Sequence, residues 1–438
     1  MTESVRPGFH HSPLEFVERV PLRYSSSPTT AALVELPSGV AEPIHEVLNL
    51  LWLWGSVANG KGQRSAWFDP AELRSMEEEL LTSTLEEELS SALAVIVGEL
   101  VRPNARTATL PQACAAAAEW AFAARAPATA IAFMELAALC RPRSGRLALI
   151  AGRTLKNHGK PREAEYWLRR SAKLSHWGKD WETLVLSESS LGMLYWSQGG
   201  TARAERHLFR AFRFAKRHHL EAEMGVVNHE LFVVRVTSDR YDGVEAFAHA
   251  AFEHYLPNHP RLPHLAYDLA YYWLMRGYAH RAAPLLQKLV PHFTEPAQRV
   301  QVLSALARAA GAIGDYATFD TARRDARPIL ADPAIRATRA AALIDFGFGA
   351  CNFQLWADAA TFFSEAARAA EAAGQHDMLI RADTCLKSVA LSENPDTPPR
   401  PQGVAAQQTD SEHLAAACLA VLAGWGNSTY LDPGVAAR

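Results

Sequence analysis

Small and hydrophobic residues recur along most of this chain with the spacing of paired α-helices. Within residues 145–217, Gly152 is followed twelve residues later by Ala164, and Gly159 lies between them. The same spacing occurs a second time at Gly192, Gly199 and Ala204. A small residue in the first helix of a pair lets the second helix approach closely, and a glycine ends the first helix in a left-handed turn. The pattern therefore predicts two consecutive helical hairpins.

Hydrophobic positions around these anchors also correspond between the two hairpins. The matched pairs are Leu155 and Tyr195, Leu168 and Leu208, and Ser171 and Ala211. The second hairpin resembles the tetratricopeptide repeat (TPR) through Leu191, Gly192, Tyr195, Gly199, Ala204, Leu208 and Ala211, and Ser171 in the first hairpin is a conservative departure from that pattern. The resemblance implies an all-α fold, an α-solenoid of about seven TPR-like hairpins that form a right-handed superhelix behind an N-terminal helical cap.

The repeat continues through residues 111–392, with weaker copies on both sides of the central pair. Equivalent positions in the first helix of each hairpin are 34 to 40 residues apart, at Ala118, Gly152, Gly192, Phe232, Ala270, Ala307 and Gly347. Asp239 takes the glycine place in the hairpin that begins near Leu231. Because a solenoid needs its last apolar face covered, Met378–Leu391 is expected to be a capping helix.

The N-terminal part of the chain differs from the repeats. Residues 1–40 show little periodicity and predict an irregular or partly extended arm, whereas residues 41–110 predict a helical cap. Glu42–Gly55 is apolar on nearly every face, so this helix is expected to be buried, either against the solenoid or in a partner. Asp69 followed by Pro70 predicts the start of the next helix.

Residues 393–438 predict a flexible linker followed by a short C-terminal helix. The stretch 394–410 is rich in Pro and Gln and has no means of packing. Glu412–Ala423 has the apolar side chains of an amphipathic helix, at Leu414, Cys418, Leu419 and Leu422. Two interpretations remain open for this helix. It is either an ordinary tail that packs on the last repeat or a docking peptide, which in an autoinhibitory variant occupies the protein's own groove.

In TPR-like hairpins the first helix lines the concave groove, which implies the side chains that a partner would meet. These positions hold aromatic, polar and cationic residues and one methionine: Arg153, Lys156, Asn157, Met193, Trp196, His229, Tyr267, Tyr271, Arg308, Phe348 and Asn352. Aromatic rings give contact area at low entropic cost and arginine pairs with carboxylates, so the set suits an extended or helical peptide. The two-lysine, two-asparagine carboxylate clamp of chaperone-binding TPR proteins is not reproduced. The alternative is that several of these aromatics pack against the next repeat.

A second candidate surface is a row of five arginines spaced three and four residues apart, here called the arginine ridge: Arg203, Arg206, Arg210, Arg213 and Arg217. This spacing places them along one stripe of a helix, on the outer face of the second hairpin. Such a stripe suits an acidic protein surface, a phosphate backbone or the protein's own acidic N-terminal helices. The alternative is an ordinary solvated helix face.

Composition and charge narrow the class of protein. The 438 residues have a formal net charge of −3, which gives no general attraction to nucleic acid or to an anionic membrane. The five cysteines occur singly, which argues against a zinc site or a disulfide framework and fits a reducing cytosol. The first residues contain no apolar run, and the apolar stretch 47–58 is too short to span a bilayer. A cytoplasmic protein is expected.

Motifs that would carry chemistry are weak. Gly55–Lys61 fits the first seven places of a P-loop, but Gly62 replaces the hydroxyl residue that would hold magnesium, and no βαβ pattern surrounds it. The histidines at 249, 254, 259 and 264 have a five-residue spacing, which does not keep ligands on one helical face. We therefore expect no catalytic residues, no metal and no cofactor.

These observations together predict a non-catalytic scaffold, adaptor or regulatory subunit that binds another protein or a peptide in the groove of a TPR solenoid. Tyr271, Trp196, Tyr267 and Arg153 are the expected main contacts. The alternative is a regulator that binds nucleic acid or an acidic partner through the arginine ridge. No membrane association is expected.

Overall fold

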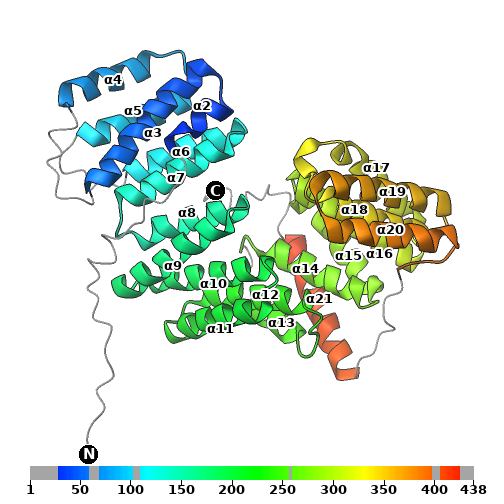
Figure 1. Ribbon diagram of the computed structural model, residues 1–438. Helices are drawn as coiled ribbons and strands as arrows, with labels where there is room; N and C mark the ends of the chain where they lie inside the picture. Colours follow the sequence, from blue (N-terminus) through cyan, green and yellow to red (C-terminus); the bar gives the residue numbers. More distant parts are fainter. Residues whose placement is uncertain (1–27, 59–68, 102–108, 256–258, 397–404, 425–438) are drawn as a thin grey trace, which may run out of the picture. The chain divides into compact units, whose positions relative to one another are not determined.

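The computed structural model describes residues 28–58, 69–101, 109–255, 259–396 and 405–424, and every regular element in these ranges is a helix. Consecutive helices pack against each other as hairpins (Figure 1), which confirms the predicted all-α solenoid. The chain divides into two compact units between Glu223 and Met224. Residues 111–392, predicted as one solenoid, thus contribute helices to both units.

The first unit begins with short elements and continues as four hairpins. Its elements are η1 (Pro28–Thr30), α2 (Ala31–Glu35), α3 (Ser38–Ala58), α4 (Pro70–Thr82), α5 (Glu87–Val101), α6 (Thr109–Ala123), α7 (Pro127–Cys140), α8 (Gly145–Asn157), α9 (Pro161–Gly178), α10 (Trp181–Ser197) and α11 (Thr201–Arg217). Residues 28–40, expected within an irregular arm, form η1, α2 and the first residues of α3. The rest of that arm lies outside the described residues.

Among the described residues, the second unit contains ten α-helices, and the boundary between the units lies in the first turn of the first of them. Its elements are α12 (Glu221–Val236), α13 (Glu245–His254), α14 (Leu262–Met275), α15 (Ala279–Leu289), η3 (Val290–His292), α16 (Pro296–Ile313), α17 (Tyr316–Leu330), η4 (Pro333–Ile335), α18 (Arg339–Asn352), α19 (Trp356–Ala373), α20 (His376–Ala390) and α21 (Ala405–Gly424). The predicted capping helix is α20, which packs on α19.

Small residues at the helix crossings act as the sequence pattern predicted. A Cβ atom added to Gly152 of α8 would lie 2.8 Å from the side chain of Leu168 in α9. The same atom on Gly192 of α10 would lie 2.8 Å from the side chain of Leu208 in α11. Because real Cβ atoms do not approach other atoms this closely, a larger residue would require the leucine side chain to move or the two helices of the hairpin to separate.

The ends of the first helices also follow the prediction. Gly159 has φ +70° and Gly199 has φ +77°, the left-handed conformation that glycine adopts without a steric penalty. Asp239, predicted to take the glycine place, has φ +54°. At the start of α4, the Asp69 side chain accepts a hydrogen bond of 2.8 Å from the Ala71 backbone N–H, and Pro70 is the first helical residue.

Helix α3 belongs to the core of the first unit. Ile44, Val47, Leu48 and Leu51 are fully buried, and α3 packs against α7 and α5. Of the two environments left open for this helix, the structure thus shows the intramolecular one.

Helix α21 starts at Ala405, earlier than the predicted Glu412, and packs on α15 of the second unit (Figure 1). Leu414, Cys418 and Leu422 are buried in the same hydrophobic cluster as Leu285 of α15. Arg281 of α15 pairs with Glu412 at 3.0 Å. The C-terminal helix therefore docks in the middle of its own unit rather than at the last repeat. No helix among the described residues is long and apolar enough to cross a membrane.

Candidate functional site

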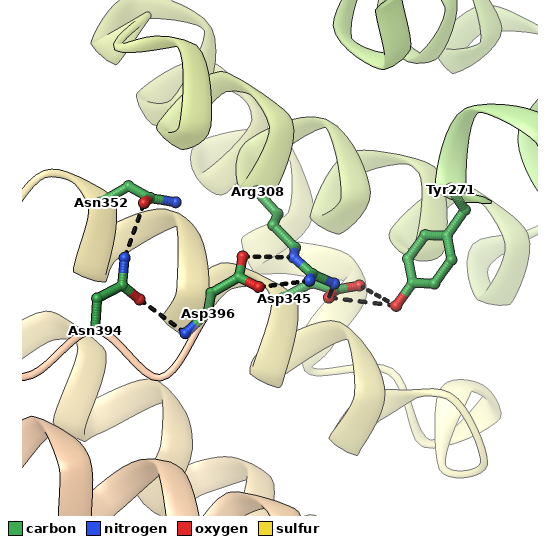
Figure 2. Close-up of polar contacts among 6 residues, drawn as sticks. All are labelled: Tyr271, Arg308, Asp345, Asn352, Asn394 and Asp396. Carbon is green, nitrogen blue, oxygen red and sulfur yellow. Dashed lines mark hydrogen bonds and ion pairs between the residues drawn. The ribbon is translucent and has the colours of Figure 1, made fainter. Parts of the chain in front are cut away.

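A buried network of charges on the first helices of the last hairpins centres on Arg308 of α16. Its Nη1 donates to Asp345 Oδ1 of α18 at 3.1 Å. Its Nε and Nη2 donate to the two carboxylate oxygens of Asp396 at 2.8 and 2.6 Å. Figure 2 shows the guanidinium held between these two carboxylates. Arg308 thus binds one carboxylate in the two-pronged geometry that suits its planar group, and a second one through a single hydrogen bond.

These charges are almost completely removed from solvent. The side chains of Arg308, Asp345 and Asp396 are only 5%, 7% and 9% exposed. Asp345 raises the pKa of Arg308 despite burial, so the guanidinium stays charged. Burial raises the pKa of Asp345, and Arg308 opposes that shift. Since charges are costly to bury unpaired, the two carboxylates and the guanidinium depend on one another.

Asp396 comes from the segment that leaves α20 and returns to the hairpins. The Asn394 amide donates to Asn352 Oδ1 of α18 at 2.9 Å, and the Asp396 backbone N–H donates to Asn394 Oδ1 at 2.9 Å (Figure 2). The second of these bonds closes a local turn that aims the Asp396 carboxylate at Arg308. Residues 394–396, predicted as part of a linker without packing, therefore lie on helix α18.

Aromatic side chains surround the Arg308 network. The guanidinium carbons of Arg308 and Arg381 lie 4.7 and 5.3 Å from the centroid of the Phe348 ring. The Tyr271 hydroxyl of α14 donates to both oxygens of Asp345 at 3.4 Å. Burial raises the pKa of Tyr271 to about 12, so the phenol keeps its proton at neutral pH and acts as a donor. Tyr267 stacks on Tyr271 with 6.0 Å between ring centroids, and burial raises its pKa strongly.

We call Tyr271, Arg308, Asp345, Phe348 and Asn352 together the Arg308 site. Four of these five were predicted from the repeat as groove positions, and the structure brings those four to one place. Asp345 was missed, as were Asn394 and Asp396. A signal for Asp345 existed, because an acidic residue inside the apolar stretch Leu343–Gly349 needs a buried cation.

The predicted groove residue His229 of α12 lies in a separate polar cluster. Its Nε2 is 2.8 Å from Asp268 Oδ2, and its Nδ1 is 3.2 Å from the Tyr255 hydroxyl. Burial raises the pKa of Tyr255 well above its usual range, so the phenol keeps its proton and donates a hydrogen bond to Nδ1. The proton of the imidazole ring is therefore assigned to Nε2, which donates a hydrogen bond to Asp268. Both ring nitrogens of His229 thus have a hydrogen-bond partner. The cluster links α12 and α14 and holds no activated nucleophile.

The remaining groove residues lie on the first unit. Arg153 donates from Nε to Ser190 Oγ of α10 at 3.0 Å. Met193, Lys156 and Trp196 are partly buried, and Asn157 is exposed. A partner-binding role for these residues stays a prediction.

All five arginines of the arginine ridge are exposed on α11. Among the described residues they form one ion pair, between Arg210 Nε and Glu188 Oε1 at 3.4 Å. Three of them, Arg203, Arg206 and Arg210, line a pocket together with Arg169.

The described residues of the weaker motifs do not form a catalytic or metal-binding arrangement. Gly55–Ala58, the start of the P-loop-like stretch, form the last turn of α3, and Lys61 and Gly62 lie outside the described residues. His259 stacks on Tyr255 with 4.1 Å between ring centroids, and burial lowers its pKa to about 4. The five cysteines are free thiols. Within the described parts of the chain, no three His, Cys, Asp or Glu side chains are arranged to hold a metal ion.

Comparisons with known proteins give a limited result. No model of a protein family matches the chain, and no curated protein matches it. Among solved structures, it is similar to a Signal Transduction ATPase with Numerous Domains (STAND) protein with a tetratricopeptide repeat sensor from Pyrococcus horikoshii, with 11% sequence identity and a TM-score of 0.46. The match covers 91% of this chain and 64% of that protein, so the chain spans less than two thirds of its length. The fold assignment therefore rests on the helical hairpins themselves.

Proposed function

We propose that this protein is a non-catalytic interaction scaffold, and that its second unit binds an acidic segment of a partner protein at the Arg308 site. The observation that carries the proposal is the two-pronged pairing of Arg308 with Asp396, at 2.8 and 2.6 Å. Asp396 belongs to a segment outside the helical hairpins, and it occupies the site as the carboxylate of a bound peptide would. The Asn394–Asp396 turn is on this view an internal ligand.

The form of the site supports a peptide as the ligand. Asn352 pairs with the Asn394 side chain two residues before the anchoring carboxylate, so two polar side chains of one short segment are recognised. An asparagine amide and an arginine on the first helices of consecutive hairpins are well suited to hold a short acidic segment. Phe348 packs under the guanidinium and fixes its plane.

The protonation states support binding rather than catalysis. Tyr271 keeps its proton because burial raises its pKa to about 12, and it donates to Asp345. Arg308 stays charged. None of these groups is poised to exchange a proton near neutral pH, as a general acid or base must.

An internal ligand has a measurable consequence. A tethered segment competes at an effective concentration in the millimolar range, so an external peptide meets a largely occupied site. Asp396→Ala removes both hydrogen bonds of the internal carboxylate and should raise the affinity for an external acidic peptide at least about tenfold.

The test uses the full chain and a fluorescein-labelled peptide with the sequence of residues 391–398, followed by fluorescence anisotropy. Binding to the Asp396→Ala chain that is much tighter than to the unchanged chain supports the proposal. The matched control is Asp325→Ala, which removes the same charge from an exposed position on α17. A peptide with asparagine in place of its aspartate should bind neither chain. Equal binding of both peptides, or no binding to the Asp396→Ala chain, would contradict the proposal.

A further inference from the structure

The arginine ridge contains a pocket that the proposed function does not use. The pocket has a volume of about 310 Å³ and is lined by side chains of α9, α10 and α11. These three helices follow one another in the first unit (Figure 1). Arg169, Tyr195, Arg203, Arg206, His207 and Arg210 line it. Arg213 and Arg217, further along the same helix, do not. Three of the five arginines of the ridge thus line one hollow, together with Arg169 of α9.

Two carboxylates hold part of this lining in place. Glu165 accepts a hydrogen bond from Arg169 Nε at 2.8 Å and another from the Tyr195 hydroxyl at 2.7 Å. Arg169 Nη2 in turn donates to the Tyr195 hydroxyl at 2.8 Å. This closed triangle of hydrogen bonds fixes one wall of the pocket before any ligand arrives.

The second carboxylate lies beneath the pocket. Glu188 is 3% exposed, and its two oxygens are 2.7 Å from His207 Nδ1 and 3.4 Å from Arg210 Nε. The Arg210 side chain is 52% exposed, so a buried carboxylate holds this lining residue while the side chain stays accessible to solvent. A buried anchor under an exposed donor lowers the entropy that a ligand must remove on binding.

The balance of charge in the pocket is positive. Four guanidiniums face two carboxylates, Glu165 and Glu188, which leaves two positive charges when the imidazole is not counted. Arg203 and Arg206 carry this excess, because neither forms an ion pair with any described residue. Arg206 Nε reaches only the Ala202 carbonyl oxygen, at 3.3 Å, and Arg203 lies 5.9 Å from the centroid of the Tyr195 ring.

We propose that this pocket binds a phosphate monoester dianion, carried by a phosphorylated side chain of a partner protein. A phosphoryl group has a charge of about −1.5 to −2 at neutral pH and three acceptor oxygens, which match two excess charges on converging guanidiniums. A single carboxylate supplies one charge and two oxygens and leaves the pocket unbalanced. A nucleic-acid backbone would use the whole row of arginines, whereas the pocket takes only its first three.

The test measures binding of a phosphoserine peptide and its unphosphorylated counterpart to the full chain by isothermal titration calorimetry. The pocket variant is Arg203→Gln/Arg206→Gln. The matched control is Arg213→Gln/Arg217→Gln, which removes the same charge from the same helix outside the pocket. All four side chains are exposed, so circular dichroism should show an unchanged fold in both variants.

We expect the phosphopeptide to bind and the unphosphorylated peptide not to bind. The pocket variant should lose at least about tenfold in affinity, the equivalent of one charge-assisted hydrogen bond, and the control should change less than about twofold. Competition by inorganic phosphate separates the two sources of the group: weak competition supports a peptide-borne phosphate, and competition at equal concentration overturns it in favour of a free small anion.

Three other results would also overturn the proposal. One is equal loss of phosphopeptide binding in both variants, because it would show diffuse attraction by the helix. Another is absence of binding at about 1 mM peptide, near the weak limit of specific recognition. The third is tight binding of a single-stranded oligonucleotide that both variants weaken equally, which would identify the ridge as a nucleic-acid surface.

Discussion

Removing the two sides of the Arg308–Asp396 pair should have very different effects on stability. Asp396→Asn takes one carboxylate from a guanidinium that still has Asp345 at 3.1 Å. Arg308→Met takes the guanidinium from two carboxylates whose side chains are 7% and 9% exposed. The first change leaves a buried pair. The second leaves two buried acids without the cation that hydrogen-bonds them, and the Arg381 charge, which also acts on Asp345, remains.

The magnitudes follow from this difference. A hydrogen bond to a charged group contributes about 1.5–3 kcal/mol, and the asparagine retains part of the pairing, so Asp396→Asn should cost about 1–2 kcal/mol. Breaking a buried ion pair from one side costs about 3–5 kcal/mol, so Arg308→Met should lie in that range. Adding Asp345→Asn and Asp396→Asn to Arg308→Met should restore part of the loss, because no buried charge is then unpaired.

Urea unfolding followed by circular dichroism at several pH values measures these costs. In the Arg308→Met chain, Asp345 loses the cation that opposes its burial, so its pKa in the folded state rises further above the unfolded value. The folded state then binds more protons than the unfolded state in this window, and stability falls as pH rises through it. The deficit of the variant should therefore shrink as the pH is lowered toward about 4.

Two results would refute this reasoning. Asp396→Asn with the stability of the unchanged chain would mean that the Asn394–Asp396 turn does not occupy the site in solution. An Arg308→Met deficit that is independent of pH would mean that the buried carboxylates are not the cause.

Three further predictions concern other parts of the structure. Gly347→Ala places a Cβ atom 2.5 Å from the Phe363 ring, and overpacking of this kind should lower the free energy of unfolding by about 1–3 kcal/mol. His259 is kept neutral by burial, with a pKa of about 4, so its contribution of about 1–2 kcal/mol should be lost as the pH falls from about 6.5 toward 4. Leu414→Asp places a charge at a position that is 2% exposed, so the amides of α21 should lose hydrogen-exchange protection.

The first two predictions have a control variant, and the third has a result that would contradict it. Gly39→Ala, in a helix where an added Cβ atom meets nothing within 4 Å, should not destabilise the chain, and equal costs at both glycines would contradict the crossing argument. His259→Phe keeps the stack on Tyr255 and should flatten the pH dependence between pH 4 and 6.5; an unchanged slope would place its origin elsewhere. Retained protection of α21 in the Leu414→Asp chain would show that the helix is not held by α15.

The sequence predicted the hairpins well because their signals are local. Gly152 and Ala164, or Gly192 and Ala204, mark a crossing of two adjacent helices, and the left-handed glycine at the end of the first helix lies between them. The repeat register then placed Arg308 on the same helix face as the other groove residues of its unit. Both predictions, of the hairpins and of the helix face that carries Arg308, need no knowledge of contacts between residues far apart in the sequence.

The occupant of the Arg308 site was not predictable in the same way. Asp396 is 88 residues from Arg308 along the chain. It lies in a Pro-rich stretch that lacks the hydrophobic periodicity from which a packed segment could be predicted. Helix α21 shows the same limit, since its apolar face was evident but its position on α15 was not. Contacts between the repeats and irregular segments depend on complementary charge and shape in three dimensions. The local patterns of one sequence do not show which residues will meet.

Binding of an acidic peptide at the Arg308 site is tested most directly by locating an external peptide on the chain. A peptide with the sequence of residues 391–398, with a photoreactive group beside its aspartate, would be cross-linked to the Asp396→Ala chain and the linked residues identified by mass spectrometry. We expect cross-links to α16 and α18 around Arg308 and Phe348, and a much lower yield with the unchanged chain. Cross-links confined to other helices, or equal yields with both chains, would contradict it.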